Sequence, residues 1–273
     1  MRLAVCSWSL QPTDPKDLVQ KVTACGLDRV QLALSPVVRD PDIWGTVFAV
    51  LQDAGIAVES GMMETVGEDY SSLESIAKTG GLRPDEHWPA NLEHAERVAT
   101  LASEHQLALV TFHAGFLPHE AGDPERKKLL GRLREVAEVF AAGRVKLGLE
   151  TGQESAPTLA SVLAELDHPN VGVNFDPANM ILYAMGDPLE ALRVLQSSVV
   201  QIHVKDATPT KSPGTWGAEV PVGSGAVSWP DFFAVAKACP ASALVIEREA
   251  GSDRVADISA AKQCIQSLSL IHI

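Results

Sequence analysis

The sequence predicts a single (β/α)8 barrel, in which eight parallel strands close into a ring and helices surround them. Three observations lead to this fold. Short apolar runs alternate with amphipathic stretches along the chain. The length of 273 residues is close to the roughly 250 residues of a typical barrel. No linker rich in Pro, Gly and Ser divides the sequence, so residues 1–273 are expected to form one domain.

Eight apolar runs are the expected strands. They are rich in Val, Ile and Leu, and several are apolar nearly throughout, which is typical of parallel strands buried on both faces. In chain order they cover residues 3–8, 29–34, 56–61, 107–113, 145–151, 171–176, 199–204 and 243–249.

The stretches between these runs have the spacing of amphipathic helices. Leu18, Val22 and Cys25 share one helical face, and Gly26 follows them as a stop signal. These residues belong to the segment 15–26, and the same pattern is found in residues 91–105 and 124–143. About eight helices that alternate with eight strands predict a parallel sheet closed into a barrel.

Two connections exceed the few residues that usually join such elements. Residues 64–90 and 206–230 are rich in Gly and Pro, and both follow expected strands. Barrel active sites are built from the loops at the C-terminal ends of the strands. We therefore expect both loops to border a functional site, and the alternative is that they are tolerated surface insertions.

The composition limits the classes of partner and the cellular compartments that are expected for this protein. The formal net charge of −13 argues against nucleic acid, which needs clustered Lys and Arg, and favours a small-molecule substrate. Four scattered cysteines without a C-x-x-C pair indicate reduced thiols in a cytoplasmic protein. No run suits a membrane span or a signal-peptide core, so neither is expected. The final LSLIHI resembles a translated sequencing adapter, so we give His272 no weight.

Four ionisable residues lie at or near the ends of the last four expected strands: Glu150, Asp176, His203 and Glu247. Three carboxylates buried together repel one another unless a cation lies among them. One imidazole with three carboxylates suits Mn²⁺, and Mg²⁺, Co²⁺ or Zn²⁺ are alternatives. The pattern predicts one divalent metal ion in the barrel mouth. The alternative is four unrelated residues that happen to end strands.

Six more residues end or follow expected strands and are candidates for substrate contacts: His113, Asn179, Lys205, Asp206, Trp8 and Glu64. Most also have a plain structural explanation. His113 could be a hydrogen-bonded core histidine, Asn179 a helix cap and Trp8 simple packing. Lys205 could neutralise a developing oxyanion or pair with a neighbouring carboxylate.

Six segments carry a family resemblance: FHAG (112–115), LGLETG (147–152), VGVNFDPANM (171–180), QIHVKDA (201–207), VPVGSGAVSW (220–229) and VIERE (245–249). They resemble the sugar isomerase/epimerase family with the xylose isomerase-like barrel, over nearly the whole chain. The resemblance implies that Glu150, Asp176, His203 and Glu247 bind one divalent metal ion, commonly Mn²⁺. It also implies that Glu150 and Glu247 flank the substrate carbon as acid and base. Family members often form dimers or tetramers, so a homo-oligomer is compatible with it.

The implied reaction is isomerisation or epimerisation of a small polyhydroxy carbonyl compound through an enediolate. Ala156, Asn179 and Pro209 stand where ketose 3-epimerases of the family carry Glu, His and Arg, which opposes ketose epimerisation. Related members dehydrate inososes or dehydroshikimate, or cleave oxidised glycosides. Lyase chemistry at the same metal site is therefore the alternative.

Two further classes of protein fit the sequence less well. An apurinic-site endonuclease has a related barrel, but it needs extra histidines, and Asn179 stands where one of them is expected. A non-catalytic sugar-binding barrel would hold no metal ion.

Overall fold

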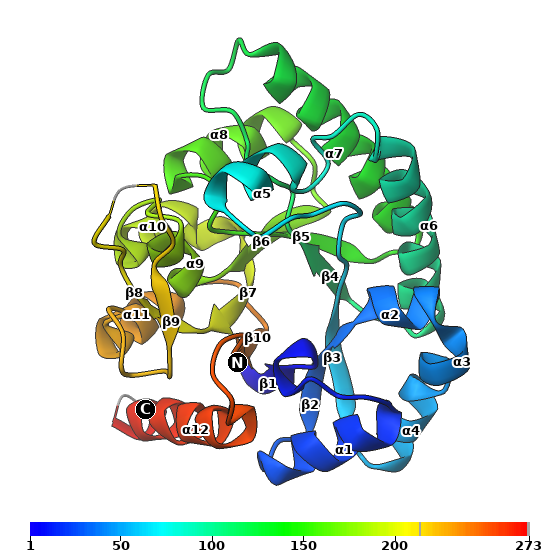
Figure 1. Cartoon of the computed structure of the whole chain (residues 1–273), viewed down its shortest axis with the longest axis vertical. Helices are drawn as coiled ribbons and strands as arrows, with labels where there is room; N and C mark the ends of the chain where they lie inside the picture. Colours follow the sequence, from blue (N-terminus) through cyan, green and yellow to red (C-terminus); the bar gives the residue numbers. More distant parts are fainter. Residues whose placement is uncertain (213, 272–273) are drawn as a thin grey trace.

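The computed structural model describes residues 1–212 and 214–271, and in it eight parallel strands form a closed barrel. The ring runs β1, β2, β3, β4, β5, β6, β7, β10 and back to β1. Figure 1 shows the strands at the centre with helices around them. The predicted fold class is confirmed. Pro213 in the second long loop and His272 lie outside the described residues.

Each barrel strand overlaps the apolar run predicted for it. The strands are β1 (Arg2–Cys6), β2 (Arg29–Ala33), β3 (Ala57–Met62), β4 (Leu109–Phe112), β5 (Lys146–Glu150), β6 (Val171–Phe175), β7 (Val199–Val204) and β10 (Ala243–Ile246). Their residues are mostly buried, as expected of strands covered by helices on the outside and by a filled interior.

Several helices begin where an acidic side chain precedes a proline. Asp14, Asp123 and Asp187 each accept hydrogen bonds from the first turn of the following helix, whose first residue is Pro. The helices are α1 (Pro15–Ala24), α2 (Leu34–Arg39), α3 (Pro41–Trp44), α4 (Val47–Asp53), α5 (Leu73–Thr79), α6 (Trp88–Glu104), α7 (Pro124–Ala142), α8 (Ala156–Leu166), α9 (Pro177–Leu182), α10 (Pro188–Leu195), α11 (Trp229–Ala236) and α12 (Arg254–Ile271), with short 3₁₀ turns at Trp8–Leu10 and Gln196–Ser198.

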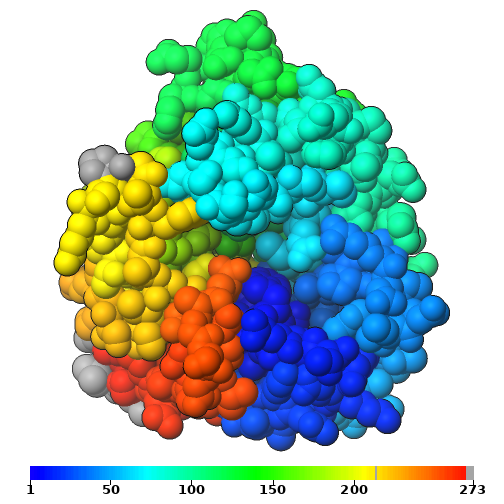
Figure 2. Space-filling model, viewed as in Figure 1, coloured from blue at the N-terminus to red at the C-terminus, as the bar shows by residue number. Residues whose placement is uncertain are grey.

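The two long loops lie over the same end of the barrel. The first carries α5, and the second forms an antiparallel hairpin of β8 (Asp206–Thr208) and β9 (Ala218–Val220). Both contribute residues to one large cavity. Figure 2 shows the hollow between the cyan first loop, the yellow hairpin, the blue N-terminal part of the chain and the orange segment that follows β10. The expectation that both loops border a site at the strand ends therefore agrees with the structure.

None of the helices in the described part of the chain has the length and apolar character needed to cross a membrane.

Candidate metal centre

The four predicted ligands come together at the C-terminal ends of neighbouring strands. Glu150 is the last residue of β5, Asp176 follows β6, His203 lies on β7 and Glu247 follows β10. Each contributes one ligand atom to a group in which these atoms lie within 4.8 Å of one another. All four side chains are buried, with at most 4% of any residue exposed.

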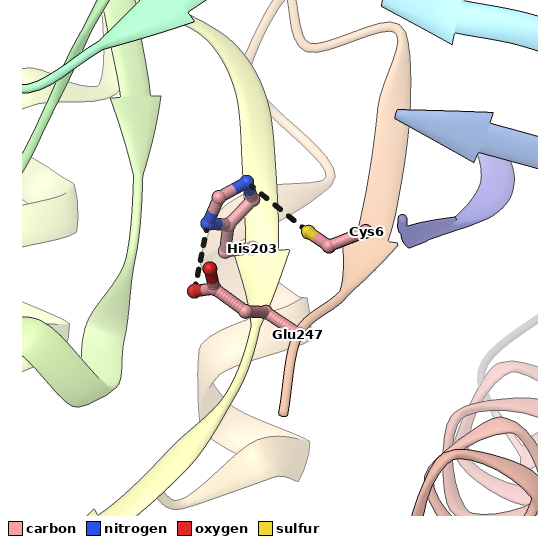
Figure 3. A group of neighbouring side chains, drawn as sticks. All are labelled: Cys6, His203 and Glu247. Atoms are coloured by element: carbon pink, nitrogen blue, oxygen red, sulfur yellow. Dashed lines mark hydrogen bonds and ion pairs between the residues drawn. The ribbon is translucent and has the colours of Figure 1, made fainter. Parts of the chain in front are cut away.

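One nitrogen of His203 faces all three carboxylates. Its Nδ1 lies 3.2 Å from Oε2 of Glu247, 3.4 Å from Oε1 of Glu150 and 3.8 Å from Oδ2 of Asp176. Figure 3 shows Glu247 on this side of the ring and Cys6 on the opposite side. The imidazole therefore presents Nδ1 to the carboxylates and Nε2 to the barrel interior.

Three atoms of this group test whether a metal ion fits. Nδ1 of His203, Oδ2 of Asp176 and Oε2 of Glu247 are buried and make no hydrogen bond to the described residues, although ion-pair contacts with one another and with Lys205 lie within 3.1–3.8 Å. A buried polar atom without a partner costs about 1–3 kcal/mol, and more when it is charged. A divalent cation would satisfy all three atoms, and carboxylate oxygens with one imidazole suit Mn²⁺, Mg²⁺, Co²⁺ or Zn²⁺. The donor set fits one such ion.

The charges of the group are mutually dependent. Burial by itself raises the pKa of a carboxyl, but His113 and His203 outweigh it at Glu150 and lower the pKa. At Asp176 and Glu247, burial is outweighed by Lys205 and His203, so the pKa of each is also below its ordinary value. Burial lowers the pKa of His203, yet Glu150, Cys6 and Glu247 raise it well above the ordinary value. A metal ion that binds here would displace the Nδ1 proton.

A buried polar layer below the ligands was not predicted from the sequence. Ser60 donates to Oε1 of Gln201 at 2.6 Å, and Gln201 donates to Oδ1 of Asn174 at 3.2 Å. Asn174 in turn donates to Oε2 of Glu150 at 3.2 Å. This series of donors orients the Glu150 carboxylate from inside the barrel. The available signal was a polar residue in the middle of an apolar run, as at Asn174 in VGVNF and Gln201 in VVQIHV.

Five of the six predicted substrate contacts line the cavity above the metal centre: Trp8, Glu64, His113, Asn179 and Lys205. The cavity has a volume of about 1120 Å³. Trp8 donates to Oε1 of Glu247 at 2.7 Å, and Asn179 donates to Oε1 of Glu150 at 3.1 Å. His113 Nε2 lies 3.5 Å from that same Oε1. Glu64 lies farther out, paired with Arg39 at 3.0 Å.

Lys205 is buried among acidic groups. Its Nζ lies 3.1 Å from Oε2 of Glu247 and 3.8 Å from Oδ2 of Asp176, and it donates to Glu249. It also donates to Oδ1 of Asn179 at 3.4 Å. The structure is compatible with both roles considered from the sequence: Lys205 pairs with carboxylates, and it also lines the cavity where it could neutralise an oxyanion. Sequence reasoning missed Glu249, although it lies two residues beyond a predicted ligand.

Asp206 does not lie in the cavity lining. Its carboxylate accepts hydrogen bonds from the backbone N–H groups of Gly223, Gly225 and Val227, and from Nε1 of Trp229. A Cβ at position 225 would lie 2.1 Å from Oδ1 of Asp206, so this contact requires glycine there. The expectation that Asp206 contacts substrate is therefore corrected: the carboxylate anchors the loop that follows β9.

Aromatic side chains border the outer part of the cavity. The rings of Tyr183 and Trp216 meet edge to face with centroids 4.7 Å apart, and Tyr70 lies on the first long loop. Tyr70 and Trp216 were not predicted individually, because nothing in a loop sequence indicates which side chains turn inward, and only the two loops themselves were identified. Tyr183 follows α9, outside both loops, and was not predicted.

Comparison with known proteins agrees with this geometry. A family model described as xylose isomerase-like TIM barrel matches residues 21–268. A xylose isomerase domain protein from Planctomyces limnophilus has a TM-score of 0.85 and 31% identity, and the match covers 92% of this chain and 91% of that one. The 3-keto-D-glucoside 4-epimerase of E. coli has a TM-score of 0.73 and 15% identity, with 98% and 99% covered.

Among curated proteins, a 3-dehydroshikimate dehydratase from Bacillus anthracis is 22% identical over 184 residues. That match spans 66% of this chain and 65% of the dehydratase. The proteins that share this fold thus include both an epimerase and a dehydratase. Because the family model covers most of the sequence, the chain belongs to the family of xylose isomerase-like TIM barrels.

Proposed function

We propose that the protein is a divalent-metal-dependent isomerase or epimerase of a small polyhydroxy carbonyl compound. One observation carries the proposal: Glu150 and Glu247 belong to a single buried donor group and come from β5 and from the end of β10. In the ring these two strands are separated by β6 and β7. The two carboxylates are therefore at opposite ends of the row of ligands, where they can approach a bound carbon from two sides.

Proton transfer is the chemistry that this arrangement supports. A divalent ion held by the four side chains, with Mn²⁺ favoured, would act as a Lewis acid on the substrate carbonyl. One of the two glutamates removes the proton next to the carbonyl and becomes protonated. The other takes up a proton from solvent and delivers it to the neighbouring carbon or to the opposite face, and the first then returns its proton to solvent. Asn174 and Asn179 hold Glu150, and Trp8 holds Glu247, in fixed orientations. Lys205 supplies positive charge beside Glu247.

The charge of the cavity favours an uncharged substrate. Among the described lining residues, the basic side chains are Arg39, Lys205 and Arg254. Arg39 is paired with Glu64, Lys205 donates to Glu249, and Arg254 donates to the backbone oxygen of Gly251 at 2.9 Å. Glu68 and Glu219 add negative charge to the lining. Apart from the metal ion itself, the one basic lining side chain among the described residues without a carboxylate partner is Arg254, and its N–H groups donate to backbone oxygens. We therefore infer a neutral sugar as the substrate.

A lyase is the second candidate, because the curated relative named above is a dehydratase. Loss of a hydroxyl group next to the carbanion, in place of reprotonation, would give elimination from the same first step. Dehydroshikimate itself carries a carboxylate, which the acidic cavity opposes. Neutral keto-inositols suit the cavity better.

The experiment is incubation of the Mn²⁺-loaded protein in D₂O with ketoses, aldoses, keto-inositols and dehydroshikimate, followed by NMR of the products. We expect a neutral sugar to take up deuterium next to its carbonyl and to give an isomer. A product with a new double bond would favour the lyase. Glu150→Gln should lose the exchange by orders of magnitude, whereas Glu138→Gln, on the exposed face of α7, should keep it. No exchange with any neutral compound would contradict the proposal.

We further infer a cytoplasmic enzyme that acts on small molecules and not on nucleic acid, which the net charge of −13 supports. Association into a homo-oligomer stays a prediction, and size-exclusion chromatography with light scattering would test it.

A further inference from the structure

The second ring nitrogen of His203 is held inside the barrel. Its Nε2 lies 2.8 Å from Oε1 of Gln31, 3.1 Å from Nδ2 of Asn174 and 3.8 Å from Sγ of Cys6. All of these residues are buried, and Gln31 and His203 are 0% exposed. Figure 3 shows Cys6 on the side of the ring opposite Glu247. In neutral histidine one ring nitrogen carries the hydrogen, so a hydrogen on Nε2 leaves a lone pair on Nδ1 for a metal ion.

The orientation of the Gln31 amide is fixed by two other contacts. Its Nε2 lies 2.8 Å from Oγ1 of Thr111 and 3.3 Å from the backbone oxygen of Gly61. A backbone carbonyl only accepts hydrogen bonds, so the amide nitrogen of Gln31 must point toward it. The amide oxygen therefore points toward His203 and acts as the acceptor. Gln31 thus requires a hydrogen on Nε2 of His203.

Asn174 is the competing neighbour, since its amide nitrogen also lies near Nε2 of His203. It already donates to Glu150, and its own oxygen accepts from Gln201. If Nε2 carried no hydrogen in order to accept from Asn174, two acceptors would face each other at the 2.8 Å contact with Gln31. The shorter contact, with Gln31, therefore determines that Nε2 carries the hydrogen, because two buried acceptors without a hydrogen between them are unfavourable.

We propose that Gln31 is a positioning residue that keeps the hydrogen of His203 on Nε2 and so reserves the Nδ1 lone pair for the metal ion. When Nδ1 is protonated, only that proton has to leave on metal binding, and the contact with Gln31 is unchanged. Partners of this kind fix the tautomer and the ring orientation of histidine ligands. The inference rests on the metal site of the proposed function but not on its reaction.

Three variants test this role through metal binding alone. Gln31→Met keeps most of the side-chain volume and removes the acceptor, whereas Gln31→Glu keeps an acceptor oxygen. Cys6→Ala is the matched control, because it removes another side chain near the same nitrogen. The thiol of Cys6 is only a weak hydrogen-bonding group, and it lies 3.6 Å from Oε1 of Gln31. Each protein is titrated with Co²⁺, followed by its visible absorption spectrum and by competition with a chelator, and circular dichroism checks that it is folded.

We expect Gln31→Met to bind Co²⁺ about 10–100-fold more weakly and with an altered spectrum. Gln31→Glu should regain most of the affinity, and Cys6→Ala should bind like the unmodified protein. Unchanged affinity and spectrum in Gln31→Met would overturn the proposal. An equal loss in Gln31→Met and Gln31→Glu would also overturn it, because the acceptor oxygen would then not account for the loss.

A second measurement depends neither on the Gln31 variants nor on metal binding. In the ¹⁵N-labelled metal-free protein, long-range ¹H–¹⁵N correlation reports which ring nitrogens carry hydrogen, and the His203 signals are those missing from His203→Gln. We expect hydrogen on Nε2. An Nε2 without hydrogen would refute the role of Gln31. Absence of Co²⁺ binding in the unmodified protein, with Nε2 protonated, would refute the metal site of the proposed function and leave the Gln31 contact standing.

Discussion

Nε1 of Trp8 donates a 2.7 Å hydrogen bond to Oε1 of Glu247. Trp8 follows β1 and Glu247 follows β10, and these two strands are neighbours in the ring. With Oε1 taken by the indole, Oε2 is the oxygen that faces Nδ1 of His203 at 3.2 Å. A residue that follows the first strand of the barrel thus orients the carboxylate of the last predicted metal ligand.

Trp8→Phe removes this donor and keeps most of the ring. Because a hydrogen bond to a charged group contributes about 1.5–3 kcal/mol, we expect turnover to fall by about tenfold or more. Steady-state kinetics on the Mn²⁺-loaded protein would measure it. Trp44→Phe, on α3 away from the cavity, is the control and should leave turnover unchanged. Equal turnover in the two variants would show that the indole does not orient Glu247.

Metal binding should also be visible in stability. A ligand at about 100 times its dissociation constant stabilises the folded state by about 2.7 kcal/mol, which corresponds to about 5–10 °C in a chain of this size. We expect Mn²⁺ to raise the melting temperature by this amount and a chelator to reverse it. Asp176→Asn should lose most of the increase. An equal increase in that variant would place the bound ion elsewhere.

Asp206→Asn tests the anchoring role that the structure gives to this residue. An amide has one acceptor oxygen, so it cannot keep all of the bonds that the two carboxylate oxygens accept from Gly223, Gly225 and Val227. We expect a loss of about 1–3 kcal/mol in the free energy of unfolding, measured with urea. Metal affinity should be retained, because Asp206 does not belong to the donor group. Loss of metal binding at unchanged stability would restore a direct role in the site.

Stability should depend on pH through Glu154. Burial raises the pKa of this carboxyl to about 8, from an ordinary value of 4.5. Between those two values the folded state binds more protons than the unfolded state, so stability falls as the pH rises, by up to about 1.4 kcal/mol per pH unit. Glu154→Gln should flatten this slope and be more stable than the unmodified protein at pH 8. Urea unfolding at pH 5, 6.5 and 8 measures it, and Glu138→Gln should keep the original slope.

The barrel and its four central side chains could be predicted because both depend on local pattern. Apolar runs mark the strands, and in a barrel the ends of all strands point into one mouth. The position of Glu150, Asp176, His203 and Glu247 at strand ends was therefore enough to bring them together. No side-chain detail was needed for that step.

The rest of the site depends on which way a side chain turns and on partners far along the chain. Gln31 contacts His203 across 172 residues of sequence, and nothing near Gln31 indicates that partner. Asp206 lies directly after a site lysine, yet its buried carboxylate is bound by several backbone N–H groups of the loop that follows β9. From its position in the sequence we predicted that Asp206 lines the cavity. Its hydrogen bonds show instead that it holds the loop in place.

The central claim is that one divalent ion lies among four buried side chains. The most direct measurement is an anomalous difference map from crystals grown with Mn²⁺. We expect one strong peak bound by Nδ1 of His203 and by carboxylate oxygens of Glu150, Asp176 and Glu247. A map with no peak among these four residues, or with its main peak at another place in the molecule, would contradict the account.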